Sequence, residues 1–309
     1  MKTEHGVAVI TALLVVAVAA SAASFMLAQQ SAMVDQATLV ASRAQAEAYG
    51  DTGLDWARGV LAEDGRRAGS VDHLGEGWAQ PIAALPVERA LVAGAIDDEQ
   101  GKFNLNNLVA EGKSESDFKI LQRILRELGL PMELADAVMD WIDADQDLTG
   151  NGGAEDAYYL SLPRPYRAAN QPLAHIDELY RIRGFNAATV ARLRPHVTAL
   201  PGRKRTAVNI NTASAVVLNA IFDGKVARDK LEERLAMRRT KPFLSTNDIA
   251  QWAPGADARA TSTDLNVKSD FFTVRVRVEQ DDIHLAAEAL VQRSAQGGAT
   301  TLVWRRPVY

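Results

Sequence analysis

Six carboxylates lie between residues 140 and 156, in the stretch DWIDADQDLTGNGGAED, whose middle is polar and rich in glycine. The stretch offers oxygen ligands without imidazole or thiolate, a donor set that suits calcium or magnesium better than a transition metal. A solvated acidic loop is the alternative interpretation. The metal interpretation is favoured because unbalanced carboxylates repel one another, and because Trp141, Tyr158 and Tyr159 bracket the loop and indicate packed ends. The predicted ligands are Asp143, Asp145, Asp147, Glu155 and Asp156, with Asp140 and Asn151 as further candidates.

The acidic stretch begins like an EF-hand loop, with Asp143, Asp145 and Asp147 at alternate positions. It then departs from that motif, because Leu148 stands where the EF-hand requires glycine and Glu155 comes twelve residues after Asp143 instead of eleven. Calcium accepts about 6–8 oxygens in irregular geometry. We therefore predict one or two structural Ca²⁺ ions in a loop that is not an EF-hand.

Catalytic chemistry finds little support in the remaining residues. No HExxH or other metal-binding spacing occurs among the histidines, which are His5, His73, His175, His196 and His284. No Gly-x-Ser-x-Gly motif accompanies the pair His175 and Asp177. The chain has no cysteine, which excludes disulfides, thiolate nucleophiles and zinc sites built on sulfur. We expect no enzymatic activity and no catalytic residue.

An apolar N-terminal segment precedes the elements that would hold this loop. Residues 7–34 carry no charge, and residues 7–28 are long enough, at about 1.5 Å per residue, to cross a hydrocarbon core of about 30 Å. A cleaved secretory signal is the alternative, with a possible cleavage site at residues 20–23. The helical pattern continues without proline to about residue 64, before Gly65, so we expect a retained anchor on one long helix.

The polar leader MKTEH, then Gly6 and an apolar helix, resembles a type IV prepilin signal. In that family a prepilin peptidase cleaves after the glycine on the cytoplasmic side, which implies cleavage between Gly6 and Val7, with methylation of the new terminus. Thr11 occupies the fifth mature position, where most pilins and pseudopilins carry glutamate. A subunit without that carboxylate lacks the usual contact with a neighbouring amino terminus and suits the end of a fibre.

Alternation with period two predicts a strand at residues 270–279, and residues 284–293 and 300–306, separated by a turn-rich segment, continue it as two more strands of an antiparallel meander. A shorter β unit is expected from a strand at 90–96, a turn at 97–101 and a second strand at 102–105. Helices are expected at residues 118–128, 134–142, 175–183, 187–193, 213–222 and 230–239. We therefore expect an α+β fold with a leader (1–6), a long helix (7–64), a small antiparallel sheet (65–106 and 266–309) and an inserted all-α domain of helix-hairpin-helix or SAM-like type (107–265).

This layout is similar to that of GspK, a family of minor pseudopilins of the type II secretion system. The resembling segments are DDEQGKFNLNNL at 97–108, GAEDAYY at 153–159, IDELYRIRG at 176–184 and NINTAS at 209–214. The resemblance implies calcium in the inserted domain and a place at the tip of the periplasmic pseudopilus, with GspI- and GspJ-like minor pseudopilins as partners. It also implies a single-pass anchor in the bacterial inner membrane, a periplasmic globular part and a role in exporting folded proteins across the outer membrane.

A membrane-anchored DNA-uptake receptor is the alternative function, because residues 176–200 and 208–252 resemble tandem helix-hairpin-helix units. Residues 201–250 hold ten Lys and Arg against five Asp and Glu. Against this, the usual Gly-apolar-Gly hairpin is missing, and residues 101–265 hold 22 basic against 21 acidic side chains, in a chain of net charge −5. We expect no nucleic-acid partner.

Overall fold

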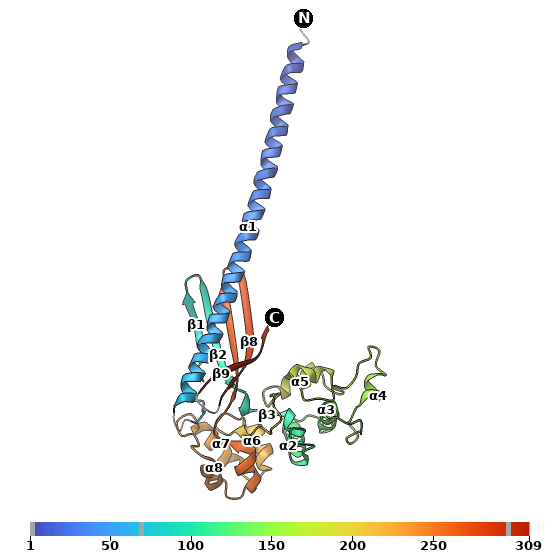
Figure 1. The fold of residues 1–309 in the computed structure, drawn as a ribbon, viewed down its shortest axis with the longest axis vertical. Coiled ribbons are helices and arrows are strands. Elements are labelled where there is room, and N and C mark those ends of the chain that lie inside the picture. Colours follow the sequence, from blue (N-terminus) through green and yellow to red (C-terminus); the bar gives the residue numbers. More distant parts are fainter. Residues whose placement is uncertain (1–3, 68–70, 295–297, 309) are drawn as a thin grey trace.

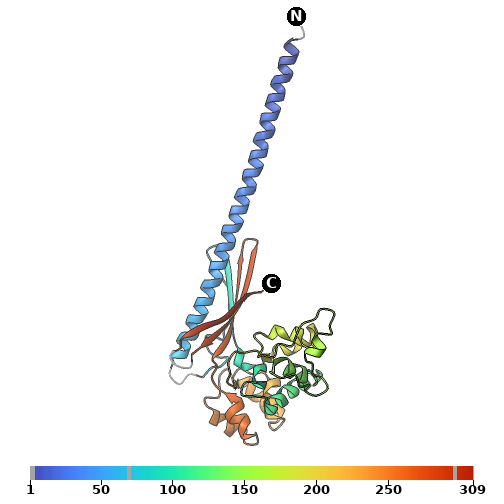
Figure 2. The ribbon, with the colours of Figure 1, turned by 45° about the vertical axis from the view of Figure 1, so that its right-hand side comes forward.

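The computed structural model describes residues 4–67, 71–294 and 298–308. The chain begins with α1 (Glu4–Arg66), whose N-terminal half projects away from the rest of the molecule (Figure 1). The C-terminal half of α1 packs on a five-stranded antiparallel sheet. A helical insertion, residues 99–270, lies at the end of the sheet far from the N-terminus (Figures 1 and 2). The predicted α+β fold with a long N-terminal helix is confirmed.

The sheet joins strands from both sides of the insertion. Its order is β1 (Ile82–Val87), β2 (Ala90–Asp98), β7 (Phe271–Gln280), β8 (Ile283–Arg293) and β9 (Thr300–Pro307). The period-two pattern of β7 buries Phe272, Val274, Val276 and Val278 against α1, in one cluster with Leu54 and Leu61. The prediction of three C-terminal strands is therefore confirmed, with bounds that differ by one residue at most.

The short β unit expected from strands at 90–96 and 102–105 joined by a turn at 97–101 is not formed. The hairpin partner of β2 is β1, which precedes it, and β2 itself runs on to Asp98 before a 3₁₀ turn at Glu99–Gly101. The short strand β3 (Phe103–Asn104) pairs instead with β4 (Val197–Thr198), in parallel. β1 has no alternating pattern because it is an exposed edge strand, where Pro86 is tolerated.

The insertion consists of short helices on a core of its own. They are α2 (Glu115–Glu127), α3 (Leu134–Ile142), α4 (Asp156–Tyr159), α5 (Ala187–Leu193), α6 (Ala215–Phe222), α7 (Arg228–Met237) and α8 (Thr246–Trp252). The predicted helices are confirmed within a few residues, except that residues 175–183 contain a 3₁₀ helix, Ile176–Arg181. The main core of the insertion is separate from the cluster between α1 and the sheet.

Two parts of the insertion repeat one scheme, and we call them the first unit (residues 103–198) and the second unit (residues 208–266). Each opens with a short strand that pairs in parallel with its last strand: β3 with β4, and β5 (Val208–Asn209) with β6 (Leu265–Asn266). A buried asparagine follows each opening strand. Asn106 brackets the backbone of Leu173, donating to its carbonyl (2.9 Å) and accepting from its N–H (2.8 Å). Asn211 does the same to Phe243, at 3.0 and 2.8 Å.

The bracketed residues are followed in each unit by a capping box. His175 and Glu178 cap the 3₁₀ helix Ile176–Arg181 in the first unit, and Ser245 and Asp248 cap α8 in the second. The two units share one core, in which α2 packs on α6. The segments NLNNL and NINTAS are thus matching structural elements of a repeat.

Candidate metal centre in the acidic loop

The acidic loop connects α3 to α4 and extends from the insertion on the side away from α1 (Figure 1). All of α3 is buried. Its last turn carries Asp140 (0% exposed), and Asp143 (3%) is its C-cap. Glu155 (4%) is the N-cap of α4. One oxygen of Asp140 and both oxygens of Asp143 and of Glu155 are buried and accept no hydrogen bond. Buried carboxylates without partners are costly, so this set calls for a cation.

Lys113 supplies part of the missing positive charge. Its Nζ lies 2.9 Å from Asp143 Oδ2, without hydrogen-bond geometry, and 2.8 Å from Asp145 Oδ2. Asp145 and Asp143 raise the pKa of Lys113. The Lys113 ammonium is half exposed. The Lys113 ammonium therefore marks a position that attracts cations, beside Asp143 and Asp145. Within the described part of the chain, Glu155 has no cationic partner.

The backbone of the loop folds closely over α3. Thr149 N–H donates to Asp140 Oδ1 at 2.9 Å, and Gly152 N–H donates to Asp136 Oδ2 at 3.0 Å. A Cβ on Gly153 would lie 2.3 Å from Asp140 Oδ2, so only glycine allows this approach. The glycines of the sequence thus serve to bring backbone and carboxylates together.

The pKa values of two carboxylates reflect this crowding. Burial, and then repulsion from Asp140, Asp143 and Asp145, raises the pKa of Glu155 to about 7. Burial also raises the pKa of Asp140. A bound divalent cation would remove both effects, because it favours the ionised form of a carboxylate.

The structure separates the predicted ligands into two groups. Asp140, Asp143 and Glu155 are buried around the loop base, with Asp145 at Lys113. Asp147 and Asn151 are exposed, and Asp156 is engaged by Arg167 Nη1 at 2.6 Å and by the N–H of Ala168. Within the described residues, no three acidic-loop side chains place their ligand atoms within 4.8 Å of one another. The oxygen ligands suit calcium, but their atoms lie farther apart than the ligands of a bound ion would.

Asp136 was missed by the sequence analysis although it faces the same loop. It lies one helical turn before Asp140 on α3 and accepts from Gly152 N–H. The signal was present, because residues four apart share one face of a helix.

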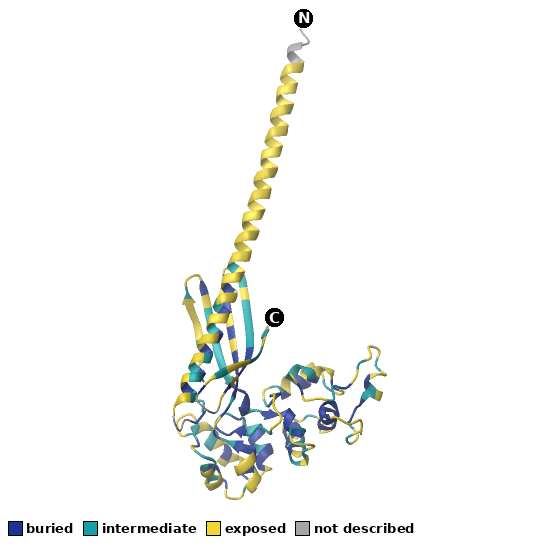
Figure 3. Cartoon of the chain, viewed as in Figure 1, coloured by how far each residue is buried: buried dark blue, intermediate teal, exposed yellow. Residues whose placement is uncertain are grey.

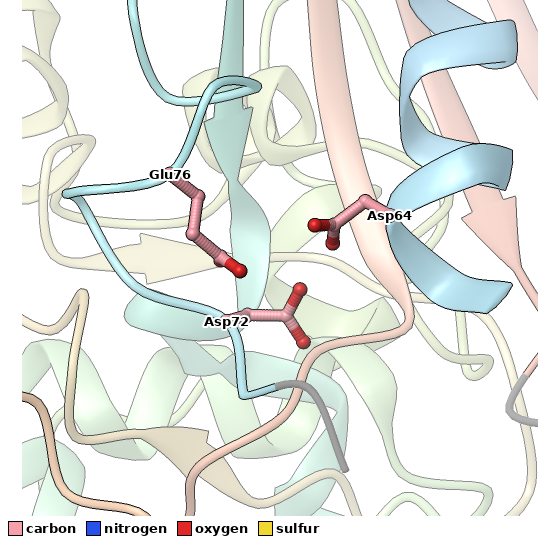
Figure 4. Close-up of side chains that lie close together, drawn as sticks. All are labelled: Asp64, Asp72 and Glu76. Carbon is pink, nitrogen blue, oxygen red and sulfur yellow. The ribbon is translucent and has the colours of Figure 1, made fainter. Parts of the chain in front are cut away.

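A second acidic cluster, at the end of α1, was also missed. Asp64, Asp72 and Glu76 bring ligand atoms within 4.8 Å of one another (Figure 4). The buried guanidinium of Arg293 pairs with Asp64 at 2.7 Å and with Asp72 at 2.5 Å. Glu76 Oε2 accepts from the N–H of His73 and the indole of Trp78. The cluster therefore already has its cation and fastens the end of α1 to β8.

The N-terminal half of α1 is exposed throughout, from Val7 to Val40 (Figure 3). Among the described residues, this helix alone is long and apolar enough to cross a membrane. Thr11 Oγ1 donates to the carbonyl of Val7 at 2.8 Å, so its hydroxyl is satisfied within the helix. Gly6 lies in α1 by its backbone, and side chains are described from Val7 onward.

Comparison with known proteins gives concordant matches. Residues 101–202 and residues 208–268 each match a protein-family model described as type II secretion system (T2SS), protein K. Type II secretion system protein K of Pseudomonas aeruginosa is 35% identical over 308 residues, covering 96% of this chain and 91% of the relative. The protein of the same name from Aeromonas hydrophila is 32% identical, covering 94% of each chain. A chain in the crystal structure of the GspK-GspI-GspJ complex from enterotoxigenic Escherichia coli superposes with a TM-score of 0.75 at 28% identity, covering 86% of this chain and 96% of that one.

Proposed function

Because the chain belongs to the type II secretion system protein K family, we propose that it is the minor pseudopilin that caps the tip of the periplasmic pseudopilus. Its role there is structural and non-enzymatic, in support of the export of folded proteins across the outer membrane. GspI- and GspJ-like minor pseudopilins are its partners in this proposal, because the similar solved chain belongs to a GspK-GspI-GspJ complex.

The position of the helical insertion is the observation that carries the proposal. The insertion lies at the end of the sheet opposite to the projecting half of α1 (Figures 1 and 2). In a fibre whose subunits stack along their N-terminal helices, the next globular domain would have to occupy the space beyond this end. A heterologous contact that is blocked on one side terminates the assembly.

Thr11 supports the same placement. Its hydroxyl is bonded to Val7 within α1, and it offers no carboxylate to the amino terminus of a neighbouring subunit. The proposal therefore needs contacts only from subunits on the membrane side of this one.

The apolar half of α1 supports a single-pass anchor in the inner membrane, with the globular part in the periplasm. We place prepilin peptidase cleavage between Gly6 and Val7, followed by methylation of Val7. Mass spectrometry of the mature N-terminus tests this step: a chain starting at Val7 is expected, and a start near Ala23 would show an ordinary signal peptide instead.

The acidic loop supports one or two structural Ca²⁺ ions. Asp140, Asp143 and Glu155 would hold the ion, with Asp145 added once calcium displaces Lys113. When bound, calcium supplies the positive charge that these buried oxygens lack. The protein contributes the oxygens and the glycine-rich backbone that closes over them.

Immunogold electron microscopy tests the tip position. Pseudopili are assembled from overproduced major pseudopilin in the source bacterium, and this chain carries an epitope in the β8–β9 turn. Label at one end of each fibre is expected. Label spread along the fibres would reject the capping role while leaving family membership intact.

A further inference from the structure

A cleft of about 650 Å³ separates the sheet from the helical insertion. Its sheet wall includes Thr273 and Arg275, which alternate along β7 with the side chains packed on α1 and so face the opposite side. Its other wall comes from the insertion and includes Ile176, Arg238 and Arg239. The volume falls within the range of about 300–1,000 Å³ that is usual for ligand sites.

Most of the charges in this cleft are paired. Arg275 binds Asp97, and Arg306 binds Glu288 at 2.7 Å as well as Asp177. Asp177 also holds Arg194, another residue of the lining. Of these pairs, Arg306 with Asp177 joins the two walls, and the others neutralise charges within one wall.

Arg238 and Arg239 differ from the other cations of the cleft. Arg238 is half buried, and its guanidinium donates to the carbonyl of Ala213. Burial, and then repulsion from Arg239, lowers the pKa of Arg238. Among the described residues, neither arginine forms an ion pair with a carboxylate. Arg238 and Arg239, neighbours in sequence that both line the cleft, thus have no carboxylate partner, and guanidinium groups bind carboxylates in bidentate geometry.

Apolar and aromatic side chains lie beside these charges, together with polar lining residues such as Glu99, Lys102 and Thr198. Leu290 and Trp304 belong to the sheet wall, and Leu74 and Trp78 to the segment that follows α1. A ligand that matches this site has an anionic group beside apolar groups.

We propose that the cleft binds an acidic peptide segment of a protein partner, whose carboxylate is received by Arg238 and Arg239. A peptide fits better than a nucleic acid, because only two unpaired cations converge in a half-apolar hollow, whereas a duplex needs a row of phosphate contacts. The proposal does not depend on the tip position, since the cleft is formed within a single chain.

Affinity selection with peptide pools tests the proposal. The full chain in detergent micelles is immobilised and exposed to acetylated heptapeptides with a central Glu between randomised apolar residues, or to a matched pool with central Gln. We expect the Glu pool to be retained about fivefold or more over the Gln pool, as a charge-assisted contact predicts. In the variant R238Q/R239Q the preference should disappear.

The control variant R203Q/K204Q removes the same charge from two exposed neighbours outside the cleft. This control variant should keep the preference for the Glu pool. If it loses the preference as fully as R238Q/R239Q does, the preference depends only on overall charge and the proposal is overturned. Equal retention of both pools by the unaltered chain would also overturn it, as would binding of a 30-base-pair DNA duplex that depends on Arg238 and Arg239 in place of peptide binding. If R238Q/R239Q melts at a lower temperature than the unaltered chain, the single variant R239Q replaces it in the test, because R239Q leaves the Arg238 bond to Ala213 in place. Loss of the Glu preference in R239Q supports the proposal, and an unchanged preference overturns it.

Discussion

The two units of the insertion use one scaffold and differ at one connection. In the first unit the chain takes a long acidic path from α3 to the bracketed Leu173. In the second, a short basic segment that includes Arg238, Arg239 and Lys241 leads from α7 to the bracketed Phe243. The asparagine brackets hold each unit closed, so this connection is free to vary in length and charge. The same position carries a buried carboxylate without a partner, Glu155, in one unit and two arginines without a carboxylate partner in the other.

The largest effect is expected from breaking a bracket. Asn106→Ala removes hydrogen bonds to Leu173 and to the carbonyl of Leu200, and leaves buried backbone groups unpaired, which should cost about 3–5 kcal/mol. Asn211→Ala breaks only the bonds to Phe243 and should cost about 2–4 kcal/mol. Urea unfolding of the full chain in detergent measures both. The exposed Asn247→Ala is the control, and a bracket variant that loses no more than this control would remove the basis of the repeat.

Calcium should act on the first unit alone. At a concentration of about 100 times Kd, a ligand stabilises the folded state by about 2.7 kcal/mol, which corresponds to a rise in Tm of about 5–10 °C. Melting curves in calcium and in chelator should show this rise, and Asp143→Asn with Glu155→Gln should abolish it. Asp147→Asn, at an exposed position, should keep it. A rise that survives the double change would place the ion elsewhere.

The attachment of the second unit to the sheet should depend on pH. Asp98 Oδ2 accepts from Asn209, Thr212 and Ser269, and burial raises the pKa of Asp98 to about 6. A raised carboxylate pKa favours the protonated folded state, so its stabilising contribution is full below about pH 3.8 and is lost as the pH rises through 6. Asp98→Asn should flatten the dependence of the free energy of unfolding on pH between about pH 4 and 6. Urea unfolding at a series of pH values, with a chelator present to remove calcium, measures it. Asp98→Asn should also cost about 1–2 kcal/mol at pH 7 through weakened hydrogen bonds. An unchanged slope would assign the pH dependence to other groups.

The smallest effect is expected at the capping boxes. Ser245→Ala removes the cap of α8 and should cost about 1 kcal/mol, or a Tm decrease of about 2–4 °C. Calorimetry compares it with Ser262→Ala, whose hydroxyl bonds only locally on the surface. His175→Ala should cost more than Ser245→Ala, because the His175 ring also packs on Trp304 at a centroid distance of 5.1 Å. Equal losses would show that this contact adds nothing.

Local periodicity accounts for what could be predicted. The alternation in residues 270–279 and the apolar residues at helical spacing in 134–142 predicted β7 and α3 almost to the residue, because both signals depend on near neighbours along the chain. β1 was missed because an exposed edge strand needs no such pattern. The acidic loop was predicted as a set of oxygen ligands, but its composition did not distinguish the buried Glu155 from the exposed Asp147.

The sequence alone determined the long apolar helix, the α+β class, the excess of oxygen ligands in one loop and the absence of sulfur chemistry, since these depend on residue type and on neighbours along the chain. Only the tertiary structure decided which carboxylates lack partners, that Arg293 pairs with Asp64 and Asp72 at the end of α1, and that Arg238 and Arg239 line a cleft without a carboxylate partner. Burial and ion pairing join residues that are far apart in sequence. No spacing along the chain encodes those distances.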